Sequence, residues 1–386
     1  NRCSQFALPN HEQTLGRRCC LAAASLLLWA WPRVARARGS ANWETSQESL
    51  LLDDFEVQEV RKVESSLQFY DVENSRFVEL PQLLSPGRKL YEADVICIGE
   101  LHDRIADHVV QRLILDSVAY QLFLDLRTSQ GESPKAMAGT SQMATKSRIT
   151  LGIEYVSRQQ GLDEFLYGGM KLGQLREILD WDSSWGYEWG IYAPLFRYAQ
   201  LSQTRILGLN LPRQVSRQVA QSGIQSLSQD IRANLPSIDT SQMRHRRRFE
   251  ENILLPSEDA ALHWARSLEG YSPMQQLDNT YQAQVLWDEY MAESCLKHFQ
   301  ESEGRLVVLA GCNHVWRDSI PDRFEAKAKS VGRRLRAVSV LPWRGSKDPS
   351  ALAALRGVAD FLWFAEGPGS GKEVTLAMEA QRKRLS

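Results

Sequence analysis

Five short apolar runs, rich in β-branched residues, recur along the chain and limit the folds that it can adopt. They cover residues 95–99, 149–156, 205–211, 305–312 and 335–342. Helical patterns separate them, and strands that alternate with helices favour a mainly parallel sheet covered on both faces. The continuous apolar character of Val95–Ile98 and Leu306–Ala310 is typical of central strands, whose two faces are both buried. We therefore predict an α/β fold with a mainly parallel β-sheet flanked by helices.

One long interval interrupts this alternation. Residues 212–304 contain no convincing strand pattern and are dominated by helix-forming, charged sequence. We interpret them as an α-helical subdomain inserted into an α/β domain, whose first part is 70–211 and whose second part is 305–345. Residues 38–69 are then a lead-in, and 346–386 a C-terminal segment and tail.

Within the predicted subdomain, four residues share one helix face. Gln284, Trp287, Asp288 and Met291 recur at intervals of three and four residues. Helical stripes of this kind are usually packing. We therefore favour Trp287 and Met291 as core residues, with Gln284 satisfying a buried polar group; a role in ligand binding is the alternative.

The first 37 residues are typical of an export leader. Arg17-Arg18 precede the apolar stretch Cys19–Trp31, and Ala35-Arg36-Ala37 offers a small-residue cleavage pattern. We predict a targeting leader of the twin-arginine type, which addresses the thylakoid lumen of a chloroplast or, in a bacterium, the periplasm. The apolar stretch is short for a bilayer span, so no stable membrane span is expected after its removal; an N-terminal anchor is the alternative.

Overall charge and cysteine content exclude several function classes. The formal net charge is -1, so binding of nucleic acid or of an anionic membrane is not implied. Beyond the leader, the cysteines are Cys97, Cys295 and Cys312, without CxxC spacing. This is neither a disulfide framework nor a zinc knuckle.

Polar residues follow four of the apolar runs. In chain order they are Glu100 and His102, then Glu154, then Asn210, and finally Asn313 and His314. Because the carboxyl ends of parallel strands meet at one edge of a sheet, where ligands bind, we expect one shared polar site. Glu100 and His102 point the same way if strand geometry persists, and together they can bind a divalent metal or share proton transfer. Asp103 is expected to cap the helix that begins near Ile105.

An aromatic segment lies between the second and third runs. Residues 181–192 contain five aromatic rings, those of Trp181, Trp185, Tyr187, Trp189 and Tyr192. They can form the wall of a site for a flat, conjugated ligand by stacking, or pack as a loop over the sheet. The sequence leaves both interpretations open.

Three other segments carry no site. Gly367–Lys372 is similar to a phosphate loop, but Glu366 stands where the first glycine is needed and Glu373 replaces the Ser/Thr. The basic run Arg244–Arg248 precedes Glu250 and Glu251, which favours a solvated, salt-bridged helix face. Residues 128–146 have the composition of a flexible surface insertion.

Taken together, the motifs resemble the ChaN-like haem-binding uptake family, which is related to the Tiki and TraB superfamily. The matching segments are Gly99-Glu100-Leu101-His102-Asp103 with His108 and Gln111, Gly152-Ile153-Glu154, Gln160 with Leu162-Asp163, Trp185–Pro194, Asn210-Leu211-Pro212-Arg213, Gln284 with Trp287-Asp288 and Met291-Ala292, and Ala310-Gly311-Cys312-Asn313-His314. The resemblance extends from Tyr70 to Pro342.

The resemblance implies an α/β domain with a helical subdomain and, in the bacterial branch, haem binding between paired subunits. Related branches are similar to metal-dependent proteases or esterases that use the positions of Gly99 to His102 and of Glu154. This chain departs from the bacterial lipoprotein members, because it has a twin-arginine leader and no evident lipid-anchored cysteine.

We accordingly expect a protein that binds haem or a related tetrapyrrole, in iron or haem handling, as a homodimer and without nucleic acid. The expected cofactor-binding residues are Glu100, His102, Glu154, Tyr187, Tyr192, Asn210, Asn313 and His314. Tyr187 and Tyr192 are the candidate axial ligands. The alternative is a divalent-metal-dependent hydrolase of the erythromycin-esterase-like type, with Glu100, His102, Glu154 and His314 as metal ligands. A lumenal scaffold without catalysis is the third interpretation.

Overall fold

The structure is a computed structural model that describes residues 62–129, 149–157, 161–254, 273–302 and 304–365. The predicted leader, residues 38–61 of the lead-in, almost all of the 128–146 insertion, Gln160 and Gly367–Lys372 lie outside these residues. Contacts divide the chain into residues 1–62 and 63–386. The description below concerns the second unit.

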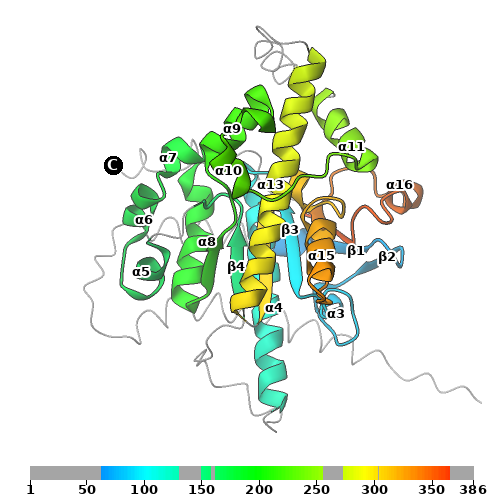
Figure 1. Ribbon diagram of the computed structural model, residues 1–386. Helices are drawn as coiled ribbons and strands as arrows, with labels where there is room; N and C mark the ends of the chain where they lie inside the picture. The colour runs from blue at the N-terminus through cyan, green and yellow to red at the C-terminus, as the bar shows by residue number, and fades with distance from the viewer. Residues whose placement is uncertain (1–61, 130–148, 158–160, 255–272, 303, 366–386) are drawn as a thin grey trace, which may run out of the picture. The chain divides into compact units, whose positions relative to one another are not determined.

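The described residues form an eight-stranded sheet of order β2-β1-β8-β7-β3-β6-β4-β5 (Figure 1). The strands are β1 (Gln68–Asp71), β2 (Arg76–Val78), β3 (Val95–Glu100), β4 (Ile149–Ile153), β5 (Arg205–Gly208), β6 (Arg305–Gly311), β7 (Ala337–Pro342) and β8 (Phe361–Phe364). From β8 to β5 all neighbours pair in parallel, whereas β1 and β2 add an antiparallel edge. The predicted α/β class with a mainly parallel sheet is confirmed.

The central strands are buried on both faces, as their continuous apolar sequence predicts. Every residue of β3 is buried, and β3 pairs with β6 on one side and with β7 on the other. Val95 and Cys97 point into a core cluster that includes Met291 and Phe324 from the helices over that face. Burying one such side chain contributes roughly 1.5–3 kcal/mol to folding, so this layer fixes the strand order.

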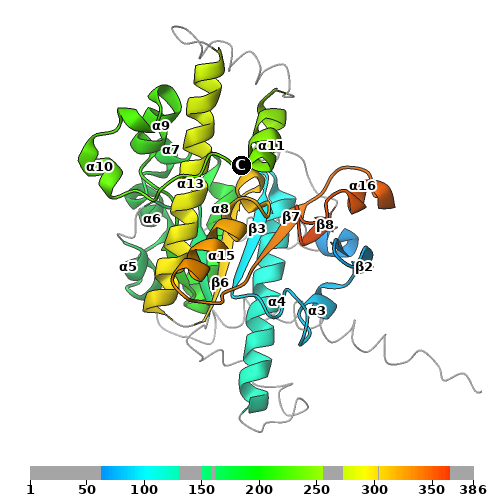
Figure 2. The ribbon, with the colours of Figure 1, turned by 45° about the vertical axis from the view of Figure 1, so that its right-hand side comes forward.

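Helices cover the sheet on both sides. α13 (Pro273–Glu301) and α15 (Ile320–Ser330) lie in front of the strands in Figure 1, and their apolar residues fill the cluster just described. Behind β3, α4 (Ile105–Ser129) packs against this strand and against α8 (Trp189–Ser202). Figure 2 shows the same arrangement after a turn of 45°.

Between β5 and β6, the described residues are helical. α9 (Arg213–Ser222) packs along α13 through a second apolar cluster that contains Val219 and Leu286. α11 (Met243–Leu254) also contacts α13. The remaining elements are α3 (Leu80–Leu83), α5 (Leu162–Tyr167), α6 (Leu172–Ile178), α7 (Trp181–Ser184), the 3-10 helix η2 (Ile224–Ser226), α10 (Gln229–Ala233), α14 (Cys312–Val315) and α16 (Pro349–Ala353).

Three strands were absent from the five runs found in the sequence. β1 and β2 form the antiparallel edge, and β8 lies within the segment that the sequence places after the α/β domain. All three are only three or four residues long, which is too short to show a period. No helix among the described residues is long and apolar enough to cross a membrane.

Candidate functional site

Three strands deliver buried polar side chains to one edge of the sheet. Glu100 is the last residue of β3, Glu154 directly follows β4, and His314 lies in α14 immediately after β6. All three are buried. Because the parallel register pairs Glu100 with Gly311, the carboxyl ends of β3 and β6 lie at the same level, and β4 ends beside them. The structure thus brings together the residues that the sequence placed in one site.

Glu100 is held by donors from three elements. Its Oε1 lies 2.9 Å from His102 Nδ1 and accepts a hydrogen bond of 3.1 Å from the Tyr192 hydroxyl. Its Oε2 accepts from Gln111 Nε2 at 2.8 Å and lies 3.4 Å from His108 Nδ1. Burial would raise the pKa of Glu100, but His108, His102 and Gln111 outweigh it and lower this pKa to about 2. Glu100 is therefore an ionised carboxylate with both oxygens engaged.

His102 is the member of the site that reaches solvent. Its side chain is 23% exposed, and its ring contacts those of Trp185 and Tyr187 at centroid distances of 4.9 Å. Burial would lower the pKa of His102, but the bond to Glu100 and the charge of Glu154 raise it. Nδ1 faces Glu100, whereas Nε2 makes no hydrogen bond to any described residue.

Gly311 leaves room for this imidazole. A Cβ on Gly311 would stand 2.8 Å from His102 Nε2 and 3.5 Å from Glu154 Oε2. Both side chains therefore lie against the same point of the backbone. The Gly311 amide donates to Glu154 Oε2 at 2.6 Å, which fixes one of its carboxylate oxygens. A side chain at this position would displace His102.

His314 lies between two carboxylates. Its Nδ1 is 2.6 Å from Asp288 Oδ1, and its Nε2 is 3.4 Å from Glu154 Oε1. Gln284 Nε2 lies 3.0 Å from the same Nδ1. Burial would lower the pKa of His314, but Glu154 and Asp288 raise it. Of the helical stripe predicted from sequence, Met291 is core and Gln284 meets a buried polar group, as expected. Trp287, also predicted as core, is half-buried and packs against the edge of both apolar clusters.

Asp288 and His245, neither of them among the predicted site residues, extend the network. The second oxygen of Asp288 lies 3.0 Å from His245 Nε2, and His245 Nδ1 lies 3.0 Å from the Tyr281 hydroxyl. Asp288 and His245 are both buried, and two histidines lower the pKa of Asp288 against the opposing effect of burial. The basic run on α11 does contain the expected salt bridge, Arg246 to Glu250 at 2.7 Å. Its histidine, however, faces inward.

The aromatic segment combines both predicted roles. Trp181 and Tyr192 are buried and pack on one another, while Tyr187 is 39% exposed. The Tyr192 hydroxyl contacts Glu100 and also lies 3.0 Å from the carbonyl oxygen of His102. The Tyr187 hydroxyl makes no hydrogen bond to any described residue. Most of the segment is therefore packing, and Tyr187 is its exposed ring beside His102.

The remaining predicted residues lie around this cluster. Asn210 is half-buried, and its buried Oδ1 has no hydrogen-bond partner among the described residues, whereas Asn313 is exposed on α14. Asp103 is exposed, and Arg104 rather than Asp103 directly precedes Ile105, the first residue of α4. His108 and Gln111, known at first only through the family resemblance, are Glu100 partners. Their three-residue spacing on α4 turns both toward the end of β3.

A divalent metal site is not supported. Among the described residues, no group of three or more His, Cys, Asp or Glu side chains is arranged to hold a metal ion. Glu100, His102, Glu154 and His314 do meet, but as carboxylate–imidazole pairs. Their oxygens face protein donors rather than a common point.

The fold and site define an α/β protein with a buried carboxylate–histidine network at the carboxyl edge of its sheet. The family described as "Haem-binding uptake, Tiki superfamily, ChaN" matches residues 88–324, more than half of the chain. The chain belongs to this family. A search of curated protein sequences gave no significant match.

One solved structure shares the fold. ChaN of Campylobacter jejuni, in a structure that describes cofacial haem binding, has a TM-score of 0.53 and 18% identity over 78% of this chain and 98% of its own. The type III effector HopBA1 has a TM-score of 0.32 and 11% identity, over 71% of this chain and 88% of its own. A Bacillus cereus protein has a TM-score of 0.32 and 13% identity, over 80% of this chain and 97% of its own. The last two scores are too low to support an argument.

Proposed function

We propose that this chain binds haem or a related tetrapyrrole at an outer mouth formed by Leu101, His102 and Tyr187. Membership of the haem-binding family supports the class of ligand. The observation that carries the proposal is that an exposed tyrosine and a partly exposed histidine lie side by side, with Leu101 37% exposed next to them. A flat, largely apolar group with a central metal matches such a surface.

The donor set at the mouth fits haem. Haem iron is held by histidine or tyrosine in known proteins, and here the Tyr187 hydroxyl and His102 Nε2 have no hydrogen-bond partner among the described residues. Tyr192, the other predicted ligand, is buried, and its hydroxyl already contacts Glu100. Burial and the charge of Glu100 also raise the pKa of Tyr192 far above its ordinary value, so its hydroxyl stays protonated. Of the two tyrosines, Tyr187 is therefore the one that would hold the haem iron.

The chain's own residues would orient the ligand. Bound haem would supply an iron centre that accepts the Tyr187 oxygen. Glu100 holds the His102 ring through Nδ1, so Nε2 is kept at the mouth. Trp185 contacts both rings of the mouth and limits their rotation. A protein that carries haem on an open edge suits transfer or storage, and iron or haem handling is the role that we propose.

The exposure of the mouth also supports a homodimer around the ligand. Leu101 and Tyr187 are 37% and 39% exposed, so a second copy of the chain could pack against them together with the ligand. Cofacial haem binding is described for the Campylobacter jejuni protein of similar fold.

Titration of the purified protein with haemin tests the proposal. We expect a saturable Soret band, weakened or shifted in Tyr187→Phe. Tyr167→Phe is the matched control, because Tyr167 is exposed on α5 away from the mouth. Sedimentation with and without haemin tests the dimer. No saturable band, or equal binding by Tyr187→Phe and wild type, would refute the assignment.

We also propose that the protein acts after export, in a thylakoid lumen or a bacterial periplasm. The support is the Arg17-Arg18 pair before the apolar stretch Cys19–Trp31. A reporter fused to residues 1–40 should be exported, and Arg17→Lys with Arg18→Lys should block its export.

A further inference from the structure

A chain of hydrogen-bonding groups runs from the site toward α11. It consists of Tyr281, His245, Asp288, His314 and Glu154, and we call it the buried relay. Successive contacts measure 3.0, 3.0, 2.6 and 3.4 Å. All five side chains are buried, and they come from α11, α13, α14 and the end of β4.

The chemistry of Asp288 fixes the protons along the buried relay. An ionised carboxylate only accepts hydrogen bonds, so the nitrogens that face it, His245 Nε2 and His314 Nδ1, must both carry hydrogen. Because His314 Nδ1 donates to Asp288, the oxygen end of the Gln284 amide is the one that suits its contact there. His314 Nε2 faces a second carboxylate, Glu154, which favours a proton on that nitrogen as well.

We propose that Asp288 and His245 are positioning residues of this site, which act through His314 to hold Glu154 in place beside His102. Asp288 keeps His314 in a doubly protonated form. His314 then holds Glu154 Oε1 while the Gly311 amide holds Oε2. Glu154 and His102 lie against the same point of Gly311, so this arrangement sets the floor of the outer mouth.

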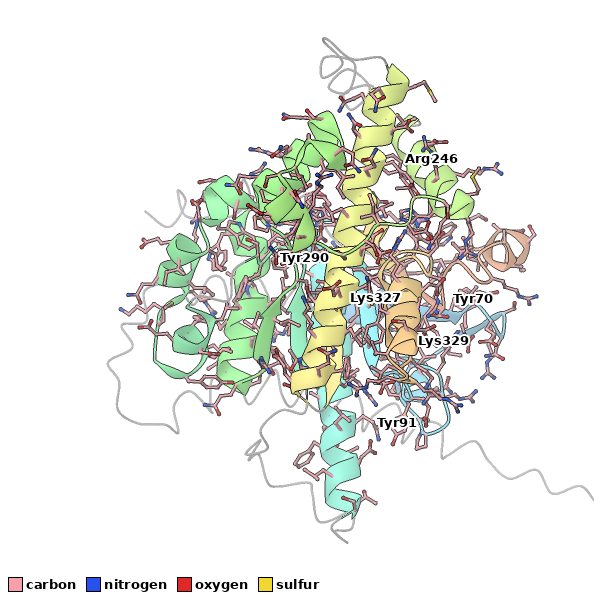
Figure 3. All side chains as sticks on the ribbon, viewed as in Figure 1. Tyr70, Tyr91, Arg246, Tyr290, Lys327 and Lys329 are labelled. Carbon is pink, nitrogen blue, oxygen red and sulfur yellow. The ribbon has the colours of Figure 1, made fainter. Side chains whose placement is uncertain are left out.

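Asp288 is the carboxylate that contacts both His245 and His314, and the charged groups around it have other partners. The nearby arginines are already paired: Arg248 with Asp318, and Arg323 with Glu289. On the far side lies Arg246 of α11, which is labelled in Figure 3. It pairs with Asp278 near the start of α13 and lies over the Tyr281 ring. The basic run of α11 thus has a solvated face and one inward residue, His245, that joins the site.

The test is the protonation of His314, measured by 15N NMR of the imidazole nitrogens at neutral pH in the full chain without ligand. The His314 signals are assigned as those lost in His314→Gln. We expect both nitrogens to carry hydrogen in the wild type and one of them to lose it in Asp288→Asn, which keeps the shape of the side chain. Asp278→Asn, on the same helix, is the matched control and should leave the signals unchanged.

The proposal is overturned if Asp288→Asn leaves both nitrogens protonated, or if wild-type His314 has a bare Nδ1. The second result needs no variant, so the proposal stays testable if Asp288→Asn does not fold. The consequence for ligand binding rests on the proposed function. There we expect haemin to bind on the order of tenfold more weakly to Asp288→Asn than to Asp278→Asn. Failure of wild type to bind haemin would refute the haem proposal alone, because the nitrogen signals are read without ligand.

Discussion

The outer mouth and the buried relay lie next to each other and are built in opposite ways. In the buried relay, Asp288 and Glu154 have both oxygens on protein partners. At the outer mouth, the Tyr187 hydroxyl and His102 Nε2 have no hydrogen-bond partner among the described residues. Buried polar groups cost free energy unless they are paired, whereas exposed ones can use water until a ligand arrives. This difference indicates that the buried relay supports the site, whereas the outer mouth is available for binding.

Glu100 supports the outer mouth from inside through His102, and its loss should have the largest effect. In Glu100→Ala, His102, Gln111 and Tyr192 lose their common partner in a buried place. We expect the free energy of unfolding to fall by about 3–5 kcal/mol in urea titrations. Glu188→Ala, an exposed change, should cost less than about 0.5 kcal/mol. A loss below about 1 kcal/mol in Glu100→Ala would mean that this carboxylate does not support the mouth.

Acid should weaken the support that Glu100 gives to the outer mouth. The pKa of Glu100 is lowered from 4.5 to about 2, so its charge stabilises the fold above pH 4.5. This contribution is lost as the pH falls through the window from 4.5 to about 2, and it amounts to about 3 kcal/mol. Stability measured against pH should therefore fall more steeply in wild type than in Glu100→Gln. Parallel curves for the two proteins would contradict the prediction.

Gly311→Ala should disturb the point at which the two regions meet. Its Cβ would stand 2.8 Å from His102 Nε2, so the imidazole must move. We expect a loss of about 1–3 kcal/mol in unfolding free energy, together with weaker haemin binding. Gly173→Ala is the control, because nothing lies within 4 Å of its added Cβ. Unchanged haemin binding in Gly311→Ala would mean that the position of His102 does not matter for ligand binding.

The two tyrosines should show the smallest effects on stability, in opposite order to their effects on binding. Tyr192→Phe removes a buried hydrogen bond to Glu100, and we expect a loss of about 1–2 kcal/mol. Tyr187→Phe removes an exposed hydroxyl and should change the unfolding free energy by less than about 0.5 kcal/mol. In haemin titrations we expect the opposite order, with the larger loss of binding in Tyr187→Phe. If the same variant showed the larger loss in both stability and binding, the distinction between inner and outer residues would fail.

Much of the fold was predictable because its signals are local. Each of the five apolar runs became a strand, β3 to β7, and the central strands β3, β4 and β6 are largely apolar because both of their faces are buried. The strands β1, β2 and β8, which lie together on one side of the sheet, escaped detection because three or four residues carry no period. Their pairing also depends on a neighbour that is distant in the sequence: Phe69 of β1 pairs with Trp363 of β8.

The candidate site was predictable only in part. Glu100, Glu154 and His314 could be found because each follows a strand, and parallel strands end at a common edge. Tyr187 and Tyr192 could not be told apart, because the turn of the backbone before α8 decides which ring is exposed.

By itself, the sequence determined the α/β class, the central strands, and a polar edge with carboxylates and imidazoles. Only the tertiary structure decided which of these groups pair. His245 and Asp288 are 43 residues apart, on different helices, and nothing local marks either as a partner of the other. Packing of α11 and α13 over the sheet removes water from both side chains, and a buried charge must then find the nearest donor. Pairing of this kind follows from burial, which no stretch of sequence specifies alone.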